Sequence, residues 1–243
     1  MKLFRFHNPL DFRFARGGRL GTWCPDPGPG VCPECTASRQ RRVPPLIMEW
    51  LPESDTIGDF VWPGGDVVVS QRVREALEER FQGFEFKPVE MWQDPKLKRP
   101  QRITKRTKPR VWLPHEGPPL YELWVTAWVH ADPERSTIRL TRDCATCGRR
   151  AYEMEGVEVR KSRWDAIKRD LVEVHIPRQA GKGIYVHQED LRSVNIFRLF
   201  EAPGWILCTE RVKTLIEDRA FSNVAFLEVG DVLRSPSDRG GSG

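Results

Sequence analysis

Two pairs of cysteines are the residues in this sequence best suited to chemistry. Cys32 and Cys35 form one CxxC motif, and Cys144 and Cys147, followed directly by Gly148, form a second. A CxxC knuckle curls the backbone so that both thiolates face one cation, and a tetrahedral zinc ion takes four such ligands. We therefore predict a zinc site made by these four cysteines. The zinc would be structural, because four thiolates leave no position open for water.

The distance between the two motifs leaves alternatives open. More than a hundred residues separate them, whereas the pairs of a zinc ribbon lie roughly 15 to 20 residues apart. The two pairs need not share one ion, and flexible reduced thiols or a redox pair are the other interpretations. A thioredoxin-like pair belongs at a helix N-terminus after a strand, but the Pro-rich sequence around Cys32 is typical of a loop. Cys24 is a less favoured substitute ligand, and Cys208 ends an apolar run and is expected to be a buried small hydrophobe.

Motifs of known catalytic chemistry are missing from the sequence. It contains no glycine-rich phosphate loop, nucleophile elbow or HExxH motif. The five histidines are far apart, and the most polar cluster near an apolar run is His187 with Glu189 and Asp190. We expect this cluster to lie in a surface loop at a strand end, and an enzyme that uses it is the least supported interpretation. The prediction is that the protein is not an enzyme.

An internal repeat predicts the elements that position the cysteines. Residues 67–80 align without a gap on residues 206–219, and four positions are identical. In each copy a short apolar strand reaches Ser70 or Thr209, whose hydroxyl is expected to cap a helix. The helix has apolar residues three and four positions apart, and a second strand follows at 84–89 or 224–229. We therefore predict an α+β fold of two similar strand-helix-strand lobes with mixed or antiparallel sheet.

Length and composition narrow the class of protein. The chain has 243 residues, a formal net charge of +5 and 10% aromatic residues, and its mean hydropathy is −0.52. A disordered chain carries fewer aromatic residues, and no apolar run approaches the roughly 18 to 20 residues that cross a bilayer. The N-terminal residues lack the apolar core of a signal peptide. We expect a cytoplasmic protein without membrane contact, whose reduced cysteines favour metal ligation over disulfides.

The predicted domain organisation follows from these patterns. It comprises an N-terminal lobe over 1–93, a basic Pro-rich connecting loop over 94–119, a C-terminal lobe over 120–230 and a flexible tail over 231–243. Within the loop, residues 94–110 contain eight basic residues and one acid, and the rest of the chain has a small excess of acids. We expect a solvated loop. Phosphate binding is the alternative, although the segment lacks aromatic residues that stack on bases.

Three segments together resemble a known family. They are the second CxxC motif with Gly148, the run Asn195 to Leu199, and the run Ile206 to Val212. The chain thereby resembles the double-CXXCG motif proteins of myxobacteria, which include immunity proteins of the Sit toxin-exchange system. The resemblance extends from the Met1 to Arg5 opening to Val229. The first motif departs from the family pattern, because Thr36 stands where a glycine is expected. This substitution affects the geometry of the turn after the knuckle, but both thiolates remain in place.

The resemblance implies an immunity protein that binds one cognate toxin domain in the cytosol and neutralises it. Charge complementarity would mainly set the rate of encounter and the choice of partner. Trp and Arg are frequent anchors of interfaces, so we place the partner-binding surface on the basic loop and the tryptophans beside it, with a core position for the tryptophans as the alternative. The residues predicted for this surface are Lys96, Lys98, Arg99, Arg102, Lys105, Arg106, Trp92 and Trp112. The alternative function is a zinc-stabilised nucleic-acid-binding protein.

Overall fold

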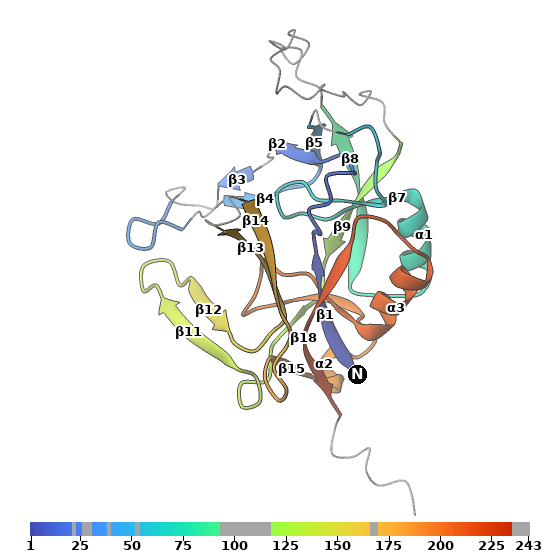
Figure 1. The fold of residues 1–243 in the computed structure, drawn as a ribbon. Helices are drawn as coiled ribbons and strands as arrows, with labels where there is room; N and C mark the ends of the chain where they lie inside the picture. Colours follow the sequence, from blue (N-terminus) through green and yellow to red (C-terminus); the bar gives the residue numbers. More distant parts are fainter. Residues whose placement is uncertain are drawn as a thin grey trace, which may run out of the picture.

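Figure 1 shows a computed structural model, which describes residues 1–20, 23–25, 31–37, 40–51, 54–92, 118–165 and 170–234. The described strands are β1 (Lys2–His7), β2 (Gly17–Leu20), β3 (Trp23–Pro25), β4 (Gln40–Arg42), β5 (Leu46–Trp50), β6 (Phe60–Val61), β7 (Val68–Ser70), β8 (Phe84–Met91), β9 (Leu120–Val125), β10 (Trp128–Val129), β11 (Ile138–Asp143), β12 (Arg150–Met154), β13 (Val159–Asp165), β14 (Asp170–Ile176), β15 (Ile184–His187), β16 (Ile196–Leu199), β17 (Leu207–Thr209) and β18 (Ala225–Leu233). The described helices are α1 (Gln71–Glu78), α2 (Gln188–Leu191) and α3 (Glu210–Asp218).

Two six-stranded sheets form the body of the protein. One has the order β2-β5-β8-β9-β7-β6 and the other has the order β10-β16-β17-β1-β18-β15. Both sheets are mixed, because β5 pairs with β8 in parallel in the first, and β18 pairs with β15 in parallel in the second. The predicted α+β class, with two strand-helix-strand units and mixed sheet, is confirmed.

Each strand-helix-strand unit is split by a third strand. In the first unit, β7 and β8 lie on either side of β9 and are both antiparallel to it. In the second unit, β17 and β18 lie on either side of β1 in the same way. The two units therefore have the same topology, but one takes its central strand from later in the chain and the other takes it from the N-terminus.

The central strand of each sheet comes from the chain segment predicted to form the other lobe. Strand β1 lies within 1–93 but pairs in the sheet of the second unit, and β9 lies within 120–230 but pairs in the sheet of the first. The predicted tail begins inside β18, which continues to Leu233. Of the predicted connecting loop, residues 94–117 lie outside the described residues.

One hydrophobic cluster joins the two units. Helix α1 buries Val73 and Leu77, and helix α3 buries Val212 and Ile216, each pair four residues apart on one helix face as the repeat predicts. These side chains belong to a single cluster, to which β1 contributes Phe4 and Phe6 among others. Helices α1 and α3 lie next to each other on one side of the molecule (Figure 1). Both units thus exclude water from the same core.

The hydroxyls expected to cap the two helices make other contacts. Ser70 and Thr209 occupy the N-cap positions, but neither side chain makes a capping hydrogen bond. The Ser70 hydroxyl instead donates to Asp59 at 2.9 Å, and Asp59 also accepts from the backbone amide of Ser222 at 3.0 Å. The Thr209 hydroxyl is buried and has no hydrogen-bond partner among the residues that the structure describes. The predicted helix starts are confirmed, and the predicted capping bonds are wrong. For Ser70 the reason is that its hydroxyl bonds Asp59, which also accepts from Ser222 after helix α3.

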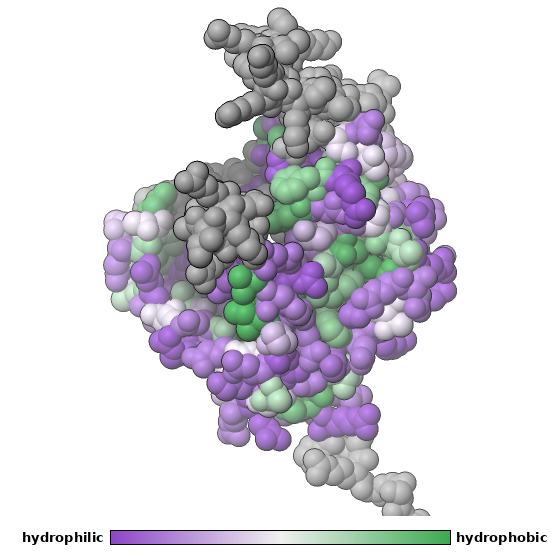
Figure 2. Space-filling view, in the orientation of Figure 1, coloured by the Kyte–Doolittle hydropathy of each residue, from purple (hydrophilic) through white to green (hydrophobic). Residues whose placement is uncertain are grey.

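Two β-hairpins, β11–β12 and β13–β14, stand apart from the main sheets as two-stranded sheets. The β11–β12 hairpin projects from one side of the molecule (Figure 1), and its turn carries the second CxxC motif. The face seen in Figure 2 is largely hydrophilic, with apolar residues in separate patches. Among the described helices, none has the length and apolar character that a bilayer span requires.

Candidate metal centre

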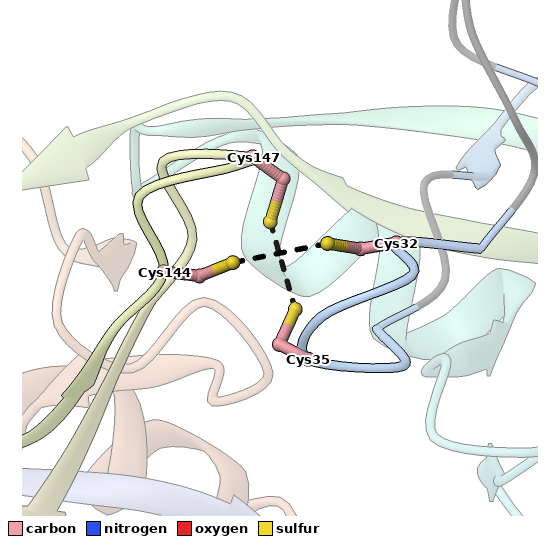
Figure 3. Close-up of side chains that lie close together, drawn as sticks. All are labelled: Cys32, Cys35, Cys144 and Cys147. Atoms are coloured by element: carbon pink, nitrogen blue, oxygen red, sulfur yellow. Dashed lines mark hydrogen bonds between the residues drawn. The ribbon is translucent and has the colours of Figure 1, made fainter.

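The four predicted ligands meet at one point. Cys32 and Cys35 lie in the loop between β3 and β4, and Cys144 and Cys147 lie in the turn between β11 and β12. Their sulfur atoms are all within 4.8 Å of one another, with 3.7 Å between Cys32 and Cys144 and 3.6 Å between Cys35 and Cys147. Figure 3 shows the four side chains pointing toward a common centre. The structure therefore brings both motifs into one cluster across the intervening sequence.

The two knuckles have the same backbone hydrogen bonds. In the first, the amide of Thr36 donates to the carbonyl of Cys32 at 2.9 Å, and the amide of Cys32 donates to the carbonyl of Ala37 at 2.9 Å. In the second, Gly148 donates to Cys144 at 2.7 Å, and Cys144 donates to Arg149 at 3.1 Å. This repeated pattern curls each chain segment tightly enough to point both of its thiols to one side.

A left-handed residue follows each knuckle. Gly148 has a φ of +68° and Thr36 has a φ of +55°. Glycine adopts this conformation without cost, whereas a β-branched residue rarely does. The Thr36 hydroxyl donates to the carbonyl of Cys35 at 2.7 Å. Thr36, at the position equivalent to Gly148, thus leaves the knuckle intact, at the cost of backbone strain.

Backbone amides prepare one of the thiols for ionisation. The amide of Cys35 lowers the pKa of the Cys32 thiol to about 6, although burial opposes the shift and the amide of Glu34 supports it. The amide of Cys147 acts in the same direction on Cys144, but burial and the neighbouring thiols outweigh it and raise the pKa of Cys144 to about 12. A first thiolate is therefore favoured, and further negative charge at the same point is opposed. A divalent cation bound by all four sulfurs would remove this repulsion.

One carboxylate links the two knuckles directly. Glu34 lies inside the first motif, and its Oε2 atom accepts hydrogen bonds from the amide of Thr146 at 3.3 Å and from the Thr146 hydroxyl, both in the second motif. The same oxygen lies 3.4 Å from the Cys144 sulfur. These bonds, the Thr146 hydroxyl first, lower the pKa of Glu34. Glu34 therefore holds the knuckles together as an ionised side chain.

The donor set and its geometry fit a tetrahedral metal ion. Four sulfurs at about 2.3 Å from a central zinc lie about 3.8 Å apart. The Cys32–Cys144 and Cys35–Cys147 sulfur separations of 3.7 and 3.6 Å are close to this value. Thiolates are soft ligands, which bind zinc, copper(I) or iron in preference to magnesium or calcium. The cluster can hold a metal ion and, with four protein ligands, would leave it no open position.

Only some of the other predicted residues lie in the part of the chain that the structure describes. Cys208 is fully buried in the cluster between the two units, and burial raises the pKa of its thiol well above the usual value. Cys24 lies in β3. Trp92 follows β8, is 41% exposed, and donates its backbone amide to Met48. The other residues of the predicted partner surface lie outside the described residues: Lys96, Lys98, Arg99, Arg102, Lys105, Arg106 and Trp112.

The histidine cluster lies at a strand end, as the sequence predicts. His187 ends β15 and its ring lies 2.7 Å from a carboxylate oxygen of Asp132. Glu189 and Asp190 follow in the four-residue helix α2 and are exposed.

Sequence reasoning missed the residues around the thiols. Glu34 is one of the two residues between Cys32 and Cys35, and only this place between two ligands hints at a role. Arg142 and Arg149 flank the second motif, and Arg142 directs a guanidinium nitrogen toward the carbonyl of Cys35 at 3.5 Å. Their contacts depend on the meeting of two distant segments, which no local pattern encodes.

A scan against protein-family models and a search of curated proteins found no match to this chain.

Proposed function

We propose that the four cysteines bind one structural zinc ion. The supporting observation is the convergence of two like knuckles, whose sulfurs stand at the separations expected around a tetrahedral zinc. The ion would connect the loop after β3 to the tip of the β11–β12 hairpin. Because the ligands come from distant parts of the chain, zinc binding would contribute directly to folding free energy.

Purified protein is expected to contain about one zinc per chain. Cys144→Ser removes one thiolate, so it should lower both the zinc content and the melting temperature. Cys24→Ser is the matched control and should change neither, because the four clustered thiols already complete a tetrahedral ligand set. Elemental analysis and thermal unfolding provide the measurements. A metal-free protein of undiminished stability would rule out the zinc site.

We propose further that the protein is an immunity protein that neutralises a cognate toxin by binding it. The resemblance to double-CXXCG proteins carries this proposal. Its three segments map onto the second knuckle, onto β16, and onto β17 with the start of α3, and β16 pairs with β17. The residues that carry the resemblance are therefore parts of the scaffold and of the candidate metal centre. This suits a family whose members share a fold and differ in the partner they bind.

Co-expression with the product of the adjacent upstream gene tests this function. If that product is the cognate toxin, the host should grow only when the present chain is also made, and the two proteins should purify together as a complex. Cys144→Ser should weaken protection, because it loosens the scaffold. Absence of rescue together with absence of a complex would contradict the proposal.

A further inference from the structure

A small pocket lies beside the metal centre, and its walls come from both knuckles. Cys35 and Ala37 of the first knuckle line one side, and Arg142, Arg149 and Ala151 of the second line the other. Its volume is about 240 Å³, which is below the roughly 300 to 1,000 Å³ typical of small-molecule sites. The pocket has room for one side chain of a partner, and it exists only where the two knuckles meet.

Two arginines at this pocket form no ion pair with the residues that the structure describes. The β11–β12 hairpin carries four arginines in the range 138–154. Arg139 pairs with Glu153, and Arg150 pairs with Asp143 at 3.2 Å. Within the described part of the chain, neither of the other two, Arg142 and Arg149, has a carboxylate at ion-pair distance. These two arginines line the pocket, and Arg142 also contributes to lowering the pKa of Glu34 from beyond ion-pair distance.

We propose that this pocket binds a carboxylate side chain of the partner protein. A guanidinium presents a planar set of donors that matches a carboxylate, and such charge-assisted bonds are stronger than neutral ones. The small side chains of Ala37 and Ala151 leave space for the methylene groups of an aspartate or glutamate. This inference rests on the proposed function, since it names the chemistry by which the toxin would be recognised.

The surrounding charges favour an acidic protein over a nucleic acid. Glu34 of the first knuckle lies close enough to Arg142 for the guanidinium charge to contribute to the lowered pKa of that carboxyl. A zinc ion with four thiolates would add a net charge of about −2, since each thiolate carries one negative charge. A single carboxylate can approach the two arginines between these groups. A phosphodiester chain carries a regularly spaced charge on every nucleotide and would meet these negative groups as well.

The construction of the pocket makes binding depend on the metal. Arg142, Arg149 and Ala151 reach Cys35 and Ala37 only while the hairpin tip is held against the first knuckle. Loss of the metal would leave the Glu34–Thr146 hydrogen bonds as a direct link between the knuckles and would loosen the two walls. We therefore expect the partner to bind the zinc-loaded protein and to lose affinity when a chelator removes the ion.

NMR titration of the zinc-loaded full chain tests the pocket. The probe is the peptide acetyl-Gly-Glu-Gly-amide, and acetyl-Gly-Gln-Gly-amide is its neutral control. Saturable shifts of the Arg142 and Arg149 side-chain Nε–H signals are expected with the first peptide only. Arg149→Gln and Arg142→Gln should each weaken binding about tenfold, a ratio equivalent to 1.4 kcal/mol. Arg139→Gln is the matched control on the same hairpin and should bind as the unaltered protein does.

The possible results distinguish a failure of the pocket proposal from a failure of the proposed immunity function. Absent or non-saturable shifts, or equal weakening by Arg139→Gln, would overturn the pocket even if co-expression still neutralised the toxin. Tighter, salt-sensitive binding of a single-stranded oligonucleotide at the same arginines would assign the pocket to a nucleic acid instead. Zinc content measured on each variant ensures that a loss of binding does not come from loss of the metal.

Discussion

At the scale of single residues, the metal centre is shaped most by the positions that follow the cysteines. Gly148 and Thr36 occupy equivalent places in the two knuckles, and both have a positive φ. A residue with a Cβ atom loses roughly 1 to 2 kcal/mol in this conformation. Thr36 therefore strains the first knuckle, and its hydrogen bond to the carbonyl of Cys35 offsets only part of that strain.

Thr36→Gly is expected to stabilise the zinc-loaded protein by about 1 kcal/mol, since the released strain exceeds the added entropy of the unfolded chain. The matched control is Gly148→Thr at the equivalent position. A Cβ atom added there meets nothing within 4 Å, so its cost is due to backbone conformation alone, and the variant should lose a similar amount. Urea unfolding at equal zinc occupancy measures both changes. A less stable Thr36→Gly protein would show that the hydroxyl matters more than the strain.

At the scale of elements, the β11–β12 hairpin depends on its two ends. The side chains of β11 beyond Ile138 are all exposed, and Leu140 is 47% exposed. An isolated two-stranded hairpin is at best marginally stable in water. At its base, Ile138 and Met154 pack against the core of the second sheet, and at its tip the cysteine cluster attaches it to the first knuckle. The metal would thus hold the free end of an otherwise weak element.

Chelation of the metal is therefore expected to open the hairpin locally. Amides in β11 and β12 should exchange faster with solvent after treatment with a zinc chelator, whereas those of β1 and β18 should keep their protection, because they lie in the centre of a buried sheet. Hydrogen exchange measured by mass spectrometry follows both regions in one experiment, and added zinc should restore the protection. Uniform loss of protection, or none in the hairpin, would contradict this division.

The elements themselves were largely predictable. The repeat predicts a helix after Ser70 and another after Thr209, and both helices bury the residues that the spacing selects. Their capping bonds were not predictable, because Asp59 is eleven residues from Ser70 and 163 from Ser222, and it meets both only in the folded chain. Local periodicity reports which face of a helix is buried, but it does not report which polar group competes for a hydroxyl.

At the scale of the whole molecule, the two units are connected in three ways. They share one hydrophobic cluster, they exchange central strands, and their knuckles meet at the metal centre. Each connection joins residues far apart in the chain, so each closes a long loop and costs more conformational entropy than a local contact does. The arrangement explains why two CxxC motifs at unusual separation form one site.

The sequence by itself determined the four thiols, the local curl of each CxxC motif, the two helices and the class of fold. These depend on residue type and on spacing over a few positions, where backbone geometry leaves little choice. Only the tertiary structure decided that β1 and β9 exchange between the units, that Glu34 reaches Thr146, and that Arg142 and Arg149 form a pocket with Ala37. Hydrophobic burial is not directional, so many pairings of distant segments satisfy the same pattern, and the register of the sheets selects one of them.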